Sequence, residues 1–255
     1  MAKKSNGGTA LVPFNVNQYP ALVEGSDLRE AIEANAQGTP MQESDLVRVP
    51  TPAGGAKQWV VPGISGEETV DELVGILVYF APRGVLWPTE DIGNSPPLLV
   101  SNDLVTATRQ GDDFGDIDPD ELEKYATGGG RYDWQKLPWN QWGSGKNGTG
   151  KRCKESRLLM LLREGSAFPL LVRAQPGSLK TVRPFIMQLP VPHWRAVVGL
   201  SLQVANSKGA GVKYSQIVPR LVDTLPREIG DQVRKLYTEQ LAGMAAGAMA
   251  SDAEG

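Results

Sequence analysis

Two apolar runs decide the fold: Arg157-Leu158-Leu159-Met160-Leu161-Leu162-Arg163 and Phe168-Pro169-Leu170-Leu171-Val172-Arg173. Each run has the length of a β-strand, and Glu164-Gly165-Ser166 between them has the composition of a tight turn. The pattern therefore predicts a β-hairpin with much of its surface in the core.

Segments on both sides of this hairpin continue the alternation of strands and turns. Before it, Val74-Gly75-Ile76-Leu77-Val78-Tyr79-Phe80-Ala81 is a nearly continuous apolar run bounded by Pro82 and Gly84, which predicts a core strand. After it, Ser178 can cap a short helix that runs to about Leu189. Residues 194–204 and 212–221 then predict a second hairpin around Asn206-Ser207-Lys208-Gly209.

The resulting order, three strands, a helix and two strands, is the order of the OB-fold, a partly open five-stranded Greek-key barrel. We therefore expect a mainly β (α+β) protein, with a five-stranded OB-fold-like barrel, N-terminal and loop elaborations and a C-terminal helix. Residues 1–25 are expected to form a flexible arm and residues 243–255 a disordered tail. Residues 26–242 are then a single domain with a long insertion at about 82–150.

The elaborations contain several expected elements of their own. A helix is expected from Ser26 to Gly38, and another from about 118 to 126 with Asp118 as its cap. Residues 46–50 and 58–62 predict a small hairpin, and residues 98–101 a short strand. The final helix, from about 227 to 241, has apolar residues at helical spacing.

Composition excludes several classes of protein. The 255 residues are 40% hydrophobic, which is enough to bury a core. No apolar run approaches the roughly 20 residues that span a bilayer, and the N-terminus lacks the apolar stretch of a secretory signal. With Cys153 and His193 as the only residues of their types, we expect no disulfide, no Cys/His metal site and no cofactor. These features favour a cytoplasmic protein.

Charge is strongly segregated along the chain. Residues 131–220 hold 15 Lys and Arg against three acidic residues, whereas the remainder holds 11 basic and 26 acidic residues. Such a stretch creates a positive field that attracts polyanions, although the net charge of the chain is -3. The alternative is that these cations are solvated, or paired with the acidic flanks.

Aromatic residues are interleaved with these cations, in the combination that binds single-stranded nucleic acid: bases stack on the rings and cations neutralise the phosphates. The stacking candidates are Trp134, Trp139, Trp142, Trp194 and Tyr214. The phosphate-binding candidates are Lys146, Lys151, Arg152, Lys154, Arg157, Lys180, Arg183, Arg195 and Lys213.

Patterns that suggest catalysis are incomplete. The segment from Gly145 to Lys151 matches G-x-x-x-x-G-K of a phosphate-binding P-loop, but Arg152 replaces the Ser or Thr that follows. The aspartates at 112–120 lack the glycine of a calcium loop. His193 has no accompanying nucleophile motif, and Cys153, whose pKa the surrounding cations could lower, has no partner. We expect no enzymatic activity and no bound metal.

Several of these elements together resemble phage and mobile-element single-stranded DNA-binding proteins with an OB-fold. The resemblance covers residues 74–222 and rests on Trp142-Gly143-Ser144, Gly150-Lys151-Arg152-Cys153-Lys154-Glu155, Pro176-Gly177-Ser178-Leu179-Lys180 and Lys213-Tyr214-Ser215, with the strand at 157–162. Similar proteins carry a Cys-x-x-Cys pair before Trp-Gly-Ser. Here Arg131 and Trp134 occupy that region, so a zinc-stabilised loop is not expected.

The resemblance implies sequence-independent binding and protection of single-stranded DNA in replication or recombination, in a bacterial or phage-infected cell. Asp252 and Glu254 in the tail could recruit replication or recombination proteins. Two alternatives remain open. One is a structural or interaction protein of a phage or mobile element, and the other is a nucleotide-binding enzyme that uses the glycine-lysine loop.

Overall fold

Strands dominate the computed structural model, which confirms a mainly β, mixed α+β protein. It describes residues 15–19, 22–23, 27, 30, 34, 46–63, 66–90, 96–166, 168–207, 212–238 and 241. The strands are β1 (Arg48–Val49), β2 (Trp59–Gly63), β3 (Gly66–Val70), β4 (Glu72–Leu86), β5 (Leu99–Ser101), β6 (Thr106–Arg109), β7 (Ala126–Gly128), β8 (Arg131–Asp133), β9 (Lys154–Leu162), β10 (Leu170–Ala174), β11 (Ala196–Asn206) and β12 (Lys213–Thr224). The α-helices whose bounds are described are α2 (Pro119–Glu123), α3 (Leu179–Met187) and α4 (Arg227–Val233).

Five antiparallel neighbours form the centre of the sheet, in the order β10-β9-β4-β11-β12. The two predicted hairpins are confirmed as β9–β10 and β11–β12, and α3 lies between them in the chain. The predicted order of strands and helix is therefore confirmed.

The prediction of a barrel is wrong, because the 10-stranded sheet remains open. The outer strands β10 and β12, both fully described, are not paired with each other. The free side of β10 is paired in parallel with β1, through Arg48 opposite Leu171 and Val49 opposite Val172. On the side of β12 that faces away from β11, side chains make the hydrogen bonds that a neighbouring strand would otherwise make.

These side chains belong to the corner of residues 176–181, which joins β10 to α3. The Ser178 hydroxyl accepts a hydrogen bond from the Ile217 amide at 3.0 Å, and the Thr181 hydroxyl donates one to the Ile217 carbonyl at 2.6 Å. Gln216 donates from its side chain to the Gly177 carbonyl at 2.6 Å. Ser178 stands at the N-cap position of α3 but makes no capping bond, because its hydroxyl is bound to β12.

The two faces of the sheet carry separate hydrophobic clusters. Successive strand residues point to opposite faces, so Leu159 and Leu161 belong to one cluster and Leu158, Met160 and Leu162 to the other. The inner cluster is covered by α3 and comprises Val49, Trp59, Val61, Leu73, Leu77, Leu159, Leu161, Leu170, Val172, Ala174, Val182, Ala196, Val198, Leu200, Leu202 and Ile217. The outer cluster is covered by α4 and comprises Tyr19, Leu22, Leu46, Ile76, Val78, Leu158, Met160, Leu162, Leu171, Val197, Leu225, Val233, Tyr237 and Leu241.

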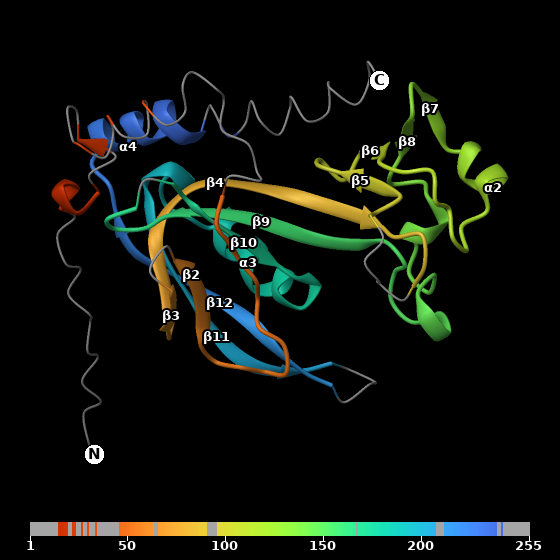
Figure 1. The fold of residues 1–255 in the computed structure, drawn as a ribbon, viewed down its shortest axis with the longest axis horizontal. Helices are drawn as coiled ribbons and strands as arrows, with labels where there is room; N and C mark the ends of the chain where they lie inside the picture. The colour runs from red at the N-terminus through yellow and green to blue at the C-terminus, as the bar shows by residue number, and fades with distance from the viewer. Residues whose placement is uncertain are drawn as a thin grey trace.

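Strand β4 is longer than its sequence predicts, because Pro82 and Gly84 lie within it rather than after it. Gly84 is required by packing: a Cβ there would lie 2.4 Å from a ring carbon of the buried Trp134. Figure 1 shows β4 and β9 running side by side from the main body into a lobe formed by the long insertion.

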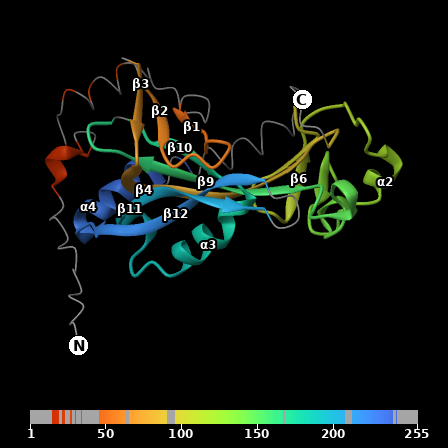
Figure 2. The same ribbon diagram turned by 90° about the horizontal axis from the view of Figure 1, so that it is seen from below.

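The lobe contains β5 to β8 and α2 around a third cluster, which includes Leu86, Leu98, Tyr132, Trp134 and Cys153. Its helix begins as predicted, with the Asp118 carboxylate accepting a hydrogen bond from the Asp120 amide at 3.0 Å. The helix is shorter than predicted because β7 begins at Ala126. Figure 2 shows the lobe with α2 at the opposite end of the molecule from α4.

The predicted hairpin of residues 46–62 is wrong, because β1 pairs with β10 and β2 pairs with β3. The reason is Trp59, which is fully buried in the inner cluster and donates its indole N–H to the Leu200 carbonyl at 2.8 Å. This contact draws β2 towards β11.

The remaining terminal predictions are tested only in part. Of the helix expected at 26–38, the residues described, Asp27, Glu30 and Ala34, are helical. The tail at 243–255 lies outside the described residues. In the part of the chain that is described, no helix has the length and apolar character required to span a membrane.

We predict that Trp59→Phe lowers the free energy of unfolding by about 1–3 kcal/mol, because it leaves the buried Leu200 carbonyl without its donor. Urea unfolding followed by circular dichroism measures this. Val60→Ala, on the exposed side of the same strand, should change the free energy by no more than about 0.5 kcal/mol. Equal effects of the two substitutions would contradict the role assigned to the indole N–H.

Candidate nucleic-acid interface

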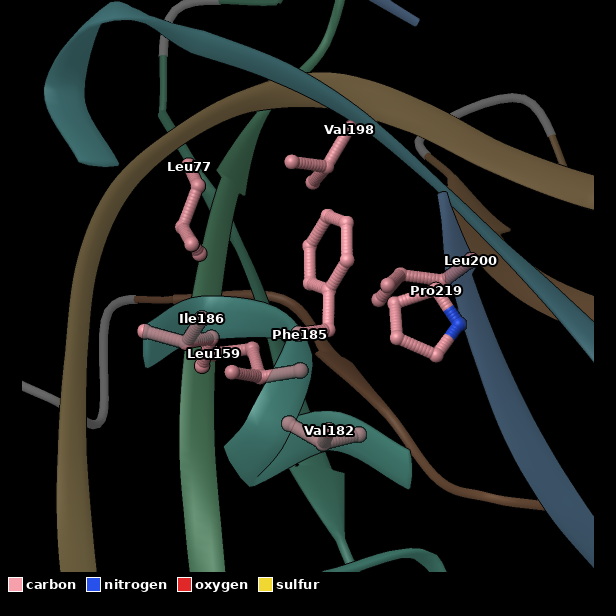
Figure 3. A pocket seen from close by; sticks show the side chains of 8 residues that line it. All are labelled: Leu77, Leu159, Val182, Phe185, Ile186, Val198, Leu200 and Pro219. Atoms are coloured by element: carbon pink, nitrogen blue, oxygen red, sulfur yellow. The ribbon is translucent and has the colours of Figure 1, made fainter. Parts of the chain in front are cut away.

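Two cations occupy the solvent-facing side of α3. Lys180 and Arg183 are exposed and one helical turn apart, and Met187, 77% exposed, continues the same side. The opposite side is anchored by Val182, Phe185 and Ile186, and Figure 3 shows Phe185 directed into a small apolar cavity between α3 and the strands. The cations are therefore held on a helix that is fixed to the core.

A third cation approaches these two from β9. Arg157 is half-buried and follows the alternation of Leu159 and Leu161, so it lies on the face of the sheet that α3 covers. Burial, followed by the positive charge of Arg183, lowers the pKa of Arg157 below its ordinary value. Two guanidinium groups are thus kept close enough to repel. We call Arg157, Lys180 and Arg183 the α3 surface.

Among the described residues, the side chains of the α3 surface have no hydrogen-bond or ion-pair partner. The carboxylate of Glu155 raises the pKa of Arg157, but this effect is weaker than the lowering by burial and by Arg183. Glu155 forms its ion pair with Lys151, at 2.9 Å. The surface therefore carries positive charge that the described part of the protein leaves uncompensated.

Tyr214 borders this surface at the corner before α3. Its ring packs so closely on Gly177 that a Cβ there would lie 2.4 Å from a ring carbon. The ring is half-buried and held on one side by backbone. Lys213, the neighbouring residue at the start of β12, is exposed.

Other predicted phosphate ligands have structural contacts. Arg152 is buried: it forms an ion pair with Asp116 at 2.6 Å and donates to the Trp87 and Pro88 carbonyls at 3.2 and 3.0 Å. Arg195 donates twice to the Leu225 carbonyl, at 3.0 and 2.9 Å. These two side chains connect parts of the fold and do not extend the α3 surface.

The lysines near the start of β9 differ in their exposure: Lys151 is partly buried, whereas Lys154 and Lys146 are exposed. Lys151 binds the Asn140 and Glu155 side chains at 3.1 and 2.9 Å. Lys154 is exposed and donates to the Lys151 carbonyl at 2.7 Å, and Lys146 is exposed in the glycine-rich loop.

The four predicted tryptophans are in different environments. Trp142 is 83% exposed at the edge of the lobe, whereas Trp134 is fully buried in the third cluster and Trp139 is partly buried against it. Trp194 packs on the outer cluster, with the Arg234 guanidinium 5.8 Å from its ring centre. Of these four, only Trp142 presents most of its ring to solvent.

The glycine-lysine loop lacks the geometry of a P-loop. A short 3-10 segment precedes it at residues 138–140, and a strand, β9, follows it where a P-loop has a helix. The Gly143 and Gly145 amides donate to the Gly150 carbonyl at 2.7 and 3.3 Å, so they are not directed at a ligand.

The other candidates for chemistry are explained by local structure. Burial raises the pKa of Cys153 to about 12, which outweighs the cations that could have lowered it and leaves an unreactive thiol. Asp116 binds Arg152 and Asp118 caps α2. Among the described side chains, no three His, Cys, Asp or Glu groups converge as metal ligands.

Some cations of the basic stretch form ion pairs with acidic residues from outside it. Arg163 pairs with Glu68 at 2.9 Å and Arg220 with Glu72 at 2.6 Å, which joins the basic stretch to acidic residues of the N-terminal half. Some cations of the basic stretch are therefore paired within the fold, and the three cations of the α3 surface are not among them.

Comparisons of the chain with protein-family models, with curated proteins and with solved structures returned no match.

We predict that Arg152→Gln lowers the free energy of unfolding by about 2–3 kcal/mol, because buried carbonyls lose a charged donor. Lys154→Gln, at an exposed position two residues along, should change it by no more than about 0.5 kcal/mol. Chemical denaturation of both variants tests this, and an equally small effect of Arg152→Gln would show that its contacts do not support the lobe.

His193 links stability to pH. Burial lowers the pKa of His193 to about 4, although its hydrogen bond to the Val78 backbone acts in the opposite direction. In the unfolded chain the ring takes up a proton below about pH 6.5. The stability that depends on the neutral ring is therefore complete above about pH 6.5 and is lost as the pH falls towards about 4.

We predict that His193→Gln loses less stability than the unsubstituted protein when the pH is lowered from about 7 to about 5, because glutamine does not titrate there. Urea midpoints at the two pH values give the comparison. An identical loss in both proteins would assign the acid sensitivity to other groups.

Proposed function

We propose that the protein binds single-stranded DNA without sequence preference and protects it during replication or recombination, with the α3 surface as the centre of the site. The observation that carries this proposal is the uncompensated charge at Arg157, Lys180 and Arg183. Holding Arg157 and Arg183 within repulsive range costs free energy, and a bound phosphate between them would offset that cost.

The arrangement of elements supports the same proposal. The five central strands keep the order of an OB-fold, with α3 between the third and fourth of them, although the sheet is open. In OB-folds, oligonucleotides bind on the face of strands 2 and 3 and on the loops between strands 1 and 2 and between strands 4 and 5. The corresponding strands are β9 and β10, and the loop between the first two strands is the lobe.

Aromatic rings stand near both ends of this region. Tyr214 lies beside the corner that leads into α3, and Trp142 lies on the loop that precedes β9. A base stacked on an aromatic ring contributes about 1–3 kcal/mol regardless of its identity. The exposed ring of Trp142 therefore supplies a place for a base, and its emission a signal for binding.

A second candidate, a structural or interaction protein, is favoured by the acidic surface of the lobe. Asp112, Asp113, Asp118, Asp120 and Glu123 are all exposed there. Such a surface could pair with the α3 surface of a second copy. Salt-sensitive self-association in the absence of oligonucleotide binding would support this candidate over the first.

The test is a tryptophan-fluorescence titration with oligo-dT at several salt concentrations. We predict that Lys180→Gln/Arg183→Gln reduces the slope of log affinity against log salt by about 1.4, or 0.7 for each lost phosphate contact on a single strand. Its unfolding midpoint should not fall, because both side chains are exposed and the loss of Arg183 relieves its repulsion of Arg157.

The matched control is Arg227→Gln/Lys235→Gln, which removes the same charge from exposed positions at the α4 end of the fold. It should leave the slope unchanged. Absence of binding by the unsubstituted protein would overturn the proposed function, and equal slope changes in the two variants would overturn its location. Duplex DNA and RNA of matched length establish the preference for single-stranded DNA.

A further inference from the structure

The segment between β1 and β2, residues 50–58, lies outside the basic stretch and holds no predicted site residue. It connects the two outer strands of the central five. The Thr51 hydroxyl donates to the Arg173 carbonyl of β10 at 3.0 Å, and the Ala56 carbonyl accepts from the Ser215 hydroxyl of β12 at 2.8 Å. Figure 1 shows this segment, drawn in orange, passing the β11–β12 hairpin before it enters β2.

Close packing fixes the segment against the start of β12. A Cβ on Gly55 would lie 3.0 Å from a methyl carbon of Val204 and 3.5 Å from the Cβ of Lys213. The φ angle of Gly55 is +78°, a conformation that favours glycine. Lys213 alternates with Ser215 and Ile217 along the strand, and Ile217 belongs to the inner cluster. The segment therefore lies on the face of the sheet that α3 covers.

The corner that leads into α3 is attached to the same strand a short distance away. Ser178 and Thr181 are hydrogen-bonded to Ile217, whereas Gly55 lies against Lys213. These two contacts are four residues apart on β12, or roughly 13 Å at about 3.3 Å per residue. The segment and the α3 surface are thus close enough to contact a single oligonucleotide.

Two lysines stand where the segment meets β12. Lys57 and Lys213 are both exposed, and neither has a hydrogen-bond or ion-pair partner among the described residues. The Asp71 carboxylate near the start of β2 accepts a hydrogen bond from the Gln58 amide at 2.9 Å. Unpaired positive charge is the property that defines the α3 surface, and these two lysines continue it along β12.

We propose that residues 53–57 form a further contact of the bound strand, in which Lys57 binds a phosphate beside the one at Lys213. This inference rests on the proposed function. It adds to the binding path a segment from outside the basic stretch and outside the five central strands. A strand that lies on the α3 surface would then continue along β12 as far as residues 53–57.

The first experiment measures the salt dependence of binding by Lys57→Gln and by a matched control, Lys235→Gln, exposed at the α4 end of the fold. The ligand is oligo-dT of about 30 nucleotides, longer than the roughly 4–16 nucleotides that one OB-fold covers. Lys57→Gln should reduce the slope by about 0.7, so that its affinity deficit shrinks about 2.6-fold between roughly 50 and 200 mM salt. The control should leave the slope unchanged.

An unchanged slope in Lys57→Gln, in a protein whose slope does respond to Lys180→Gln/Arg183→Gln, would overturn the inference and leave the proposed function intact. Absence of oligo-dT binding by the unsubstituted protein would overturn both.

A cross-linking experiment tests the location directly. Cys153 is the only cysteine of the chain, and burial raises the pKa of its thiol to about 12, so Lys57→Cys introduces a reactive thiol without competition. An aryl azide attached to that thiol should cross-link to bound oligo-dT on illumination, whereas the same reagent on Lys235→Cys should not. Equal cross-linking of the two variants, or none in Lys57→Cys while oligo-dT is bound, would overturn the inference.

Discussion

The backbone amide and carbonyl of Ile217, on the free side of β12, are hydrogen-bonded by the side chains of Ser178 and Thr181. In a closed barrel, or with a further strand beside β12, backbone groups of that strand would make these hydrogen bonds instead. A buried amide or carbonyl without a partner costs about 1–3 kcal/mol, so an open edge inside the fold needs such partners. Because these hydrogen bonds come from the corner that begins α3, they satisfy the strand and fix the helix in one arrangement. Removing them would free both the edge of β12 and the helix.

The position of α3 in turn determines the electrostatics. Its apolar side, with Val182, closes over the inner cluster, and its other side presents Lys180 and Arg183 next to Arg157 of β9. Elsewhere, several cations of the basic stretch form ion pairs, as Arg163 does with Glu68 and Arg220 with Glu72. Positive charge is thus offset in parts of the fold and retained beside α3. That selective retention, more than the total charge of the stretch, is what favours a polyanionic ligand.

Local patterns in the sequence were sufficient for the two hairpins and for the order of strands and helix. Glu164-Gly165-Ser166 joins adjacent strands, so both partners of the pairing are visible within one short window. A closed barrel was predicted wrongly because the sequence gives no sign of the side-chain hydrogen bonds that replace closure at β12. The Thr181 and Ser178 hydroxyls make these bonds to Ile217, which lies 36 and 39 positions later in the chain. The pairing of β1 with β10 is also non-local, and a two-residue strand leaves no periodic pattern to detect.

The candidate residues show the same limit. Trp134 appears in the sequence among exposed-looking turns, but Gly84, far earlier in the chain, leaves room for its ring. Arg152 belongs to a run of cations, yet it is drawn inward by carbonyls 64 and 65 residues away. The orientation of Arg173, by contrast, does have a local signal, because it stands between the buried Val172 and Ala174 at the spacing of a strand residue that faces away from the inner cluster.

The most direct test of this account is amide hydrogen exchange with and without saturating oligo-dT. We predict that bound DNA slows exchange in peptides covering residues 154–163, 170–188 and 213–217, while peptides covering α2 and α4 are unaffected. Slowed exchange confined to α2 or α4, or no change in a protein that binds the oligonucleotide, would contradict it.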